Sequence, residues 1–244
     1  MKKILFSALV LVLPLNVMAA TVFGLQVGGG SWEHSPSGTI KSSVGGVGTQ
    51  ADLEKDLQLD KKSEGYGYII LEHPIPVLPN IKVTQTNLSS AGTGSVTGAF
   101  TFNGTSYTVS QNVTSKLSLN QTDTTLYYEL LDNVVSFDIG LNAKAVKGEA
   151  TVDSTTSTFS KTVPMIYVAA EIALPAGFAI GAEMSTISSG KNTLSDTTAK
   201  ISYTTDFLLG VEAGVRTQSY KIDVDNVVAD MKFSGAFVGA FLKF

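Results

Sequence analysis

Hydrophobic and polar residues alternate along the chain in segments of about ten residues, and turn-forming residues separate these segments. The clearest segment spans residues 135–145, and three more lie at 165–174, 178–185 and 209–216. Successive side chains of a strand point to opposite faces, so each segment predicts a β-strand with one apolar face. In the first segment that face consists of Val135, Phe137, Ile139, Leu141, Ala143 and Ala145, and the other of Ser136, Asp138, Gly140, Asn142 and Lys144.

The links between the predicted strands are alternately short and long, as in outer membrane barrels with short periplasmic turns and long outer loops. A soluble sandwich also shows alternation, but here the apolar faces carry no charge. We therefore predict an all-β fold, a transmembrane antiparallel up-and-down β-barrel. The short links fall near 74–80, 132–133, 175–177 and 205–207, and the long ones near 33–64, 89–115, 147–160, 187–197 and 223–229.

The links divide the chain into ten strands, with eight or twelve as alternatives because the second long loop holds its own hairpin signal. There Phe100 and Phe102 precede Asn103-Gly104, and Tyr107 follows, which predicts a hairpin above the membrane. Hydrocarbon offers no partner for backbone polar groups, so the last strand must pair with the first. The strands are expected near 21–32, 65–73, 81–88, 116–131, 134–146, 161–174, 178–186, 198–204, 208–222 and 230–244.

The N-terminus has the features of a secretory signal peptide. Lys2 and Lys3 precede an apolar run at 4–15, and the residues before Ala19 suit signal peptidase, so residues 1–19 are expected to be removed. Residues 20–244 then form one barrel domain, located in the outer membrane. The chain has no cysteine for disulfides, and its net charge of −4 argues against nucleic-acid binding.

Several stretches resemble a small family of proteobacterial outer membrane proteins named for an N-terminal Gly-Gly motif. They are GLQVGGG at 24–30, DLEKDL at 52–57, EHPIPVLPN at 72–80, DTTLYYELLDN at 123–133 and the terminal Phe244. Gly239, Leu242 and Phe244 also look like the C-terminal signal that the barrel assembly machinery reads. The resemblance implies an outer membrane barrel and carries no established activity.

Charged residues lie on the strand faces predicted to point away from lipid. A ten-stranded barrel is only slightly wider than the eight-stranded kind, whose side chains just fill the interior. Buried charges of both signs are tolerated when they pair and hydrogen-bond, so we expect a salt-bridged plug, with a narrow pore as the alternative. The expected lumen charges are Asp138, Lys144, Glu171, Glu183, Lys200, Glu212 and Arg216.

His73 is expected to pack and to form a turn, not to act in catalysis. His73 adjoins Glu72, but adjacent strand residues point to opposite faces, which argues against a catalytic pair. Proline cannot donate to a strand ladder, so Pro74, Pro76 and Pro79 are expected to form the first periplasmic turn with Glu72 and His73.

His34 is expected just outside the first strand, beside Glu33 and near Ser31 and Ser35. A nucleophile needs a base within hydrogen-bond reach and a third group that orients the base. One His in a Gly/Ser-rich loop does not establish this arrangement, so we predict no catalytic residue.

The acidic segment 52–60 predicts a short amphipathic helix with Leu53 and Leu57 on its apolar side, capping the barrel. Its carboxylates match no calcium-binding loop, and no metal or cofactor is predicted. Aromatic residues near strand ends are expected to form girdles at the two membrane surfaces: Trp32, Tyr66, Tyr68, Tyr107, Tyr127, Tyr128, Tyr203 and Phe207.

Without a catalytic motif, the sequence favours a non-enzymatic outer membrane protein that stabilises the envelope or meets partners through its loops. A narrow channel for small solutes is the alternative, and an outer membrane lipid or peptide hydrolase is the second. Expected partners are outer membrane lipids and, during biogenesis, the assembly machinery; the sequence does not identify what binds the loops.

Overall fold

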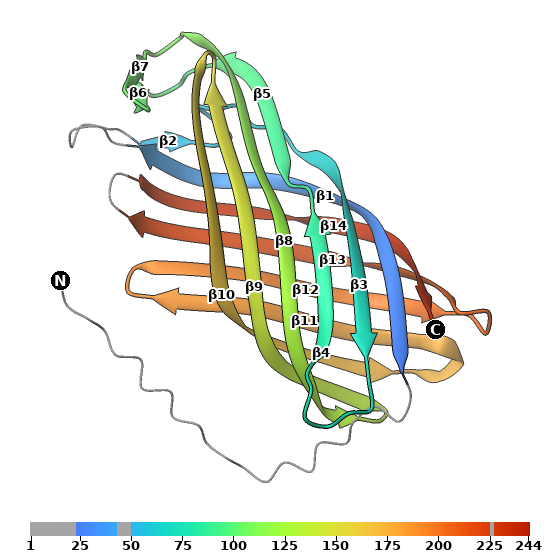
Figure 1. Ribbon diagram of the computed structural model, residues 1–244. Helices are drawn as coiled ribbons and strands as arrows, with labels where there is room; N and C mark the ends of the chain where they lie inside the picture. The colour runs from blue at the N-terminus through green and yellow to red at the C-terminus, as the bar shows by residue number, and fades with distance from the viewer. Residues whose placement is uncertain (1–22, 43–49, 225–226) are drawn as a thin grey trace, which may run out of the picture.

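The computed structural model describes residues 23–42, 50–224 and 227–244. Long tilted strands lie side by side and form a closed sheet (Figure 1). The expected signal peptide at 1–19 lies outside the described residues. Within these ranges no helix is long and apolar enough to cross a membrane.

Ten strands close the ring, as predicted. β4 (Asn80–Thr86) and β5 (Ser89–Ser95) both pair with β8 (Asn112–Asp132) and together count as one of the ten. β2 (Gln50–Asp52) pairs with the end of β1, and β6 (Phe100–Phe102) and β7 (Thr105–Tyr107) form a separate hairpin. The remaining strands are β1 (Gly24–Ser42), β3 (Lys62–Glu72), β9 (Val135–Val152), β10 (Thr155–Ala173), β11 (Phe178–Ser189), β12 (Asn192–Thr204), β13 (Leu209–Val224) and β14 (Val227–Lys243).

The last strand closes the ring against the first. β14 pairs with β1 in antiparallel register from Gln26 opposite Lys243 to Ser42 opposite Val227. One residue further, the Phe244 N–H donates to the Leu25 carbonyl (2.8 Å) and the Leu25 N–H donates to the Phe244 carbonyl (3.2 Å). The predicted pairing of the terminal segments is confirmed. We call the end with Phe244 and the short turns the inner end, and the opposite end the outer end.

The barrel's outside carries an apolar belt over its inner part. Toward the outer end the outward side chains become polar, as Ser31 and Glu33 on β1, Lys147 on β9 and Thr217 on β13 show. The membrane-spanning part of each strand therefore ends below these residues, because a charge facing hydrocarbon is strongly disfavoured. Exposed members of the belt include Val27, Ile69, Leu126, Leu141, Ile166, Ile180, Ile201, Val211, Val215 and Val238.

The strands continue past this belt into regions predicted to be loops. β9 and β10 meet at a two-residue turn, Asp153-Ser154, where a loop at 147–160 was expected. β11 and β12 likewise meet at 190–191, and β1 continues to Ser42. Above the lipid the outward face of a strand meets water and is polar, so the apolar outward face that marks a membrane strand disappears although the strand does not.

The interior of the outer end is an apolar core. The β6–β7 hairpin turns at Asn103 (φ 46°) and Gly104 (φ 84°), as predicted, and its Phe100 and Phe102 are buried. The helix expected at 52–60 is wrong in form: this segment is a series of turns. Its apolar side was correct, because Leu53 and Leu57 are buried in the same core.

Asp56 holds these turns against the segment after β5. One carboxylate oxygen accepts a hydrogen bond from the Asp52 N–H (2.9 Å), and the other accepts from the Thr97 and Gly98 N–H groups (3.2 and 2.9 Å). Burial favours a raised pKa for Asp56, but these hydrogen bonds outweigh it and lower the pKa. The charged form of the Asp56 carboxylate therefore helps to hold together the turns at the outer end.

The aromatic girdle is wrong for five of the eight residues proposed, because Trp32, Tyr66, Tyr68, Tyr107 and Tyr127 lie inside the barrel. Glycine accounts for part of this. A Cβ on Gly28 would lie 2.5 Å from Cζ of Tyr68, so the tyrosine ring occupies the space that a side chain on β1 would need. The glycine-rich start of β1 thus leaves room for tyrosine rings in the lumen.

We predict that Gly28→Ala lowers the temperature at which the folded barrel converts to its unfolded gel mobility, with a loss of about 1–3 kcal/mol from overpacking. Gly67→Ala, on the paired strand, is the matched control because its Cβ would meet its nearest neighbour at 3.6 Å. Equal thermal stability of the two variants would contradict this packing role.

Candidate functional site

Two layers of paired charges cross the lumen. Asp196 on β12 is the centre of the outer layer. Its carboxylate accepts hydrogen bonds from Arg216 (2.9 and 2.7 Å), from Lys144 (2.9 Å) and from Gln218 (2.8 Å). These donors come from β9 and β13, so the carboxylate joins strands on different sides of the ring.

The two cations of this layer have further partners. Lys144 also pairs with Asp123 on β8 (2.9 Å) and is fully buried. The Arg216 guanidinium donates to Thr86 Oγ1 (2.9 Å) and lies 5.2 Å from the centre of the Trp32 ring. Because each charge has a partner, the layer meets the condition for stable burial of ions.

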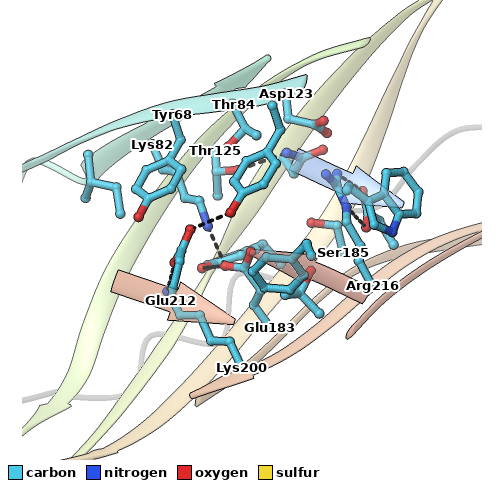
Figure 2. Close-up of a pocket in the computed structure, with 18 residues that line it drawn as sticks. Tyr68, Lys82, Thr84, Asp123, Thr125, Glu183, Ser185, Lys200, Glu212 and Arg216 are labelled. Atoms are coloured by element: carbon cyan, nitrogen blue, oxygen red, sulfur yellow. Dashed lines mark hydrogen bonds and ion pairs between the residues drawn. The ribbon is translucent and has the colours of Figure 1, made fainter. Parts of the chain in front are cut away.

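The inner layer lies next to it toward the inner end. Lys82 on β4 pairs with Glu183 on β11, and Lys200 pairs with Glu212 (3.3 Å). The Tyr66 hydroxyl donates to Glu212 (2.8 Å). Figure 2 shows Lys82, Glu183, Lys200 and Glu212 converging from different strands on the same space.

Each layer contains two cations and two carboxylates, so each is neutral. The cavity that the two layers share has a volume of only about 80 Å³. Together with the apolar core at the outer end, the layers fill the lumen over most of its length. This arrangement can brace the barrel, and it leaves little room for a solute.

A larger cavity of about 300 Å³ lies at the inner end. Asp138 and Glu171 line this cavity and form no ion pair in the described residues. The structure therefore brings five of the seven predicted lumen charges into the two layers and places these two apart from them. The cavity at the inner end is also lined by the carboxylates of Glu72, Glu129 and Asp132, and we call it the acidic vestibule.

Sequence reasoning missed three members of the layers. Lys82 follows the period-two pattern of β4 and could have been assigned to the lumen. Asp123 lies in a threonine-rich part of β8 where both faces are polar, and Asp196 lies in a region predicted to be a loop. Around Asp123 and Asp196 the sequence has no hydrophobic alternation that would identify the inward face of the strand.

The predicted turn at the inner end is organised by its histidine. The His73 N–H donates to Asn80 Oδ1 (3.0 Å), and its ring bonds the Pro79 carbonyl (3.1 Å) and the Ile75 N–H (3.3 Å). Glu72 points instead into the lumen and accepts from the Tyr127 hydroxyl (3.0 Å). Glu72 and His73 thus do not form a catalytic pair.

His34 lies on β1 inside the outer end, above the membrane-spanning part, and not in a loop as expected. It is fully buried against Trp32 and Phe233, and neither ring nitrogen has a hydrogen-bond partner among the described residues. Burial lowers the pKa of His34 to about 4, although the Glu64 carboxylate acts in the opposite direction. Among the described residues, no serine and carboxylate are hydrogen-bonded to His34 in the arrangement that a hydrolase needs.

Within the described ranges no group of three or more His, Asp or Glu side chains is placed to hold a metal ion. The carboxylates of Asp52 and Asp56, in the acidic segment 52–60, accept hydrogen bonds from nearby backbone groups.

Comparison with known proteins supports the fold. No protein-family model and no curated protein sequence matches the chain. The outer membrane protease OmpT from Escherichia coli matches with a TM-score of 0.56 and 11% identity, over 92% of this chain and 98% of that one. Ail of Yersinia pestis (10% identity, 91% and 99% coverage) and neisserial surface protein A (13%, 91% and 97%) reach TM-scores of only 0.37. The chain has the fold of outer membrane β-barrels, and its apolar belt suits it to that membrane.

We predict that Asp196→Ala destabilises the barrel by about 3–5 kcal/mol, because it leaves Arg216 and Lys144 buried without their shared carboxylate. Thermal unfolding in detergent measures the effect. Asp230→Ala is the matched control because it removes an exposed ion pair with Lys221 (3.4 Å), worth about 1 kcal/mol or less. Similar losses for both variants would contradict a bracing role for the layer.

We also predict that acid destabilises the wild type more than His34→Leu. The pKa of His34 rises from about 4 in the folded state to its ordinary 6.5 on unfolding, so the unfolded chain binds the proton more tightly. Stability is lost as the pH falls from about 6.5 toward 4, by about 3 kcal/mol. Thermal unfolding at both ends of this range measures it, and parallel pH profiles for the two proteins would contradict the assignment.

Proposed function

We propose that the protein is a sealed, non-enzymatic outer membrane barrel that presents a rigid β-structure outside the membrane to partners. The observation that carries the proposal is the filled lumen. One neutral layer crosses the lumen and consists of Asp123, Lys144, Asp196 and Arg216. An apolar core lies between this layer and the outer mouth of the barrel.

A channel needs a continuous path of water from one mouth to the other. The side chains nearest such a path are held by several interactions each, as the four hydrogen bonds to Asp196 illustrate. Moving them aside would leave buried charges unpaired, which costs several kcal/mol. The packing therefore favours a closed barrel over the alternative of a narrow solute channel.

The hydrolase alternative has less support. OmpT is a protease, but at 11% identity its likeness to this chain extends to the fold alone. His34 has no hydrogen-bonded serine or carboxylate within the described ranges. What extends beyond the membrane is instead a set of long, paired strands, which suits a scaffold for binding.

The expected result in planar bilayers is that the purified protein gives no steady conductance steps under conditions in which a water-filled porin does. A folded sample is verified by its heat-dependent gel mobility. Steady, ion-selective conductance of the wild type would overturn the proposal in favour of a channel.

A further inference from the structure

The β9–β10 hairpin carries an open sheet edge outside the membrane. Thr155 to Met165 of β10 pair with β9, but pairing with β11 begins only at Ile166, opposite Thr186. The hairpin tip reaches the β6–β7 hairpin at the top of Figure 1, apart from the tip of the β11–β12 hairpin. Among the described residues, the outer part of β10 from Thr155 to Met165 therefore has a partner strand on one side only.

The turn of this hairpin shows which peptide groups face the open side. Asp153 and Ser154 form a two-residue turn between Val152 and Thr155, so those flanking residues form the hydrogen-bonded pair. Peptide groups alternate sides along a strand, so those of Thr156 and every second residue after it point away from β9. The Thr156 carbonyl accepts from Asn103 Nδ2 (3.3 Å), in agreement with this phase.

The following residues in this phase are Thr158, Ser160 and Thr162, whose N–H and C=O groups lie on the open side. Pro164 comes next and has no N–H, which explains why the ladder with β11 stops below it. The other edge of the same sheet is covered instead: near β5 the Asp60 N–H donates to the Ala91 carbonyl (3.2 Å).

The side chains beside this edge define its chemistry. Phe159 lies against Gly148 on the face that continues the lumen lining, and 44% of its surface is exposed. Lys161 lies on the same face two residues on and is exposed, with no ion pair among the described residues. Glu149, a carboxylate on the neighbouring strand β9, already pairs with Lys116 (3.6 Å).

We propose that this edge binds an extended polypeptide segment of another protein by antiparallel strand addition, with a carboxylate opposite Lys161 and an apolar side chain opposite Phe159. Backbone hydrogen bonds supply affinity in this mode, and alternate side chains supply specificity. The proposal rests on the proposed function, because it names the binding site and partner class of the sealed scaffold.

A second copy of the chain does not fit this site. Two copies in one membrane have the same orientation, so their β10 strands both run from the outer to the inner end. An antiparallel partner must run the other way. A flexible segment outside the cell has no such restriction.

The probe is a fluorescent peptide, Thr-Thr-Glu-Thr-Val-Thr-Thr, in which Glu and Val share one face, and anisotropy measures its binding to the folded mature protein in detergent. Ser160→Pro removes a donor from the open edge while sparing the β9 ladder, and we expect it to weaken binding about tenfold or more. Ser160→Ala keeps the backbone N–H and is the matched control, expected to bind as wild type.

Charge reversal at Lys161 tests the contribution of the side chains to peptide binding. Lys161→Glu should reject the Glu peptide and accept one in which Lys replaces Glu. The proposal is overturned if the wild type does not bind the peptide. It is also overturned if Ser160→Pro, with an intact gel mobility, binds as tightly as wild type, or if Lys161→Glu binds the Glu and Lys peptides equally. Bilayer conductance is measured on the same preparation, so a barrel that is sealed but does not bind refutes only the strand-addition site.

Discussion

The structure depends on closure of every backbone edge inside the hydrocarbon. Lipid cannot hydrogen-bond an N–H or C=O group, so the sheet is stable there only as a complete ring. The pairing of β14 with β1, which ends with two hydrogen bonds between Leu25 and Phe244, completes that ring. The terminal residues are therefore as important for the fold as the centre of any strand.

Closure creates an interior that must be filled, and the chain fills it in three ways along its length. Aromatic and aliphatic side chains fill the outer end, two neutral layers of ion pairs fill the middle, and an acidic vestibule opens at the inner end. Neutrality within each layer is the physical condition, because an unpaired ion in this surrounding would cost several kcal/mol. A barrel built in this way is braced across its width by Asp196 and its partners.

Outside the lipid the constraint of closure no longer applies, because water can satisfy an open edge. β10 uses this freedom: its outer part leaves one row of peptide groups unpaired, and Pro164 stands where that part begins. The same strand is thus a sealed wall in the membrane and an open edge above it. The part of the molecule that lipid does not constrain is the part available for recognition.

Much of the fold was readable from the sequence because lipid imposes a period of two on membrane strands. Residues such as Ile139, Ile166, Val211 and Val238 face lipid as predicted, and five of seven lumen charges join the layers. The sequence alone determined the phase of the membrane strands and the closing pair, because both follow from local alternation and one boundary condition. It favoured ten strands but left eight and twelve open. It did not determine where strands end above the lipid, that Asp123 and Asp196 complete the ion pairs, or that Trp32 and His34 face inward. Those outcomes depend on which strands lie across the lumen from each other, and only the closed tertiary structure brings such distant residues into contact.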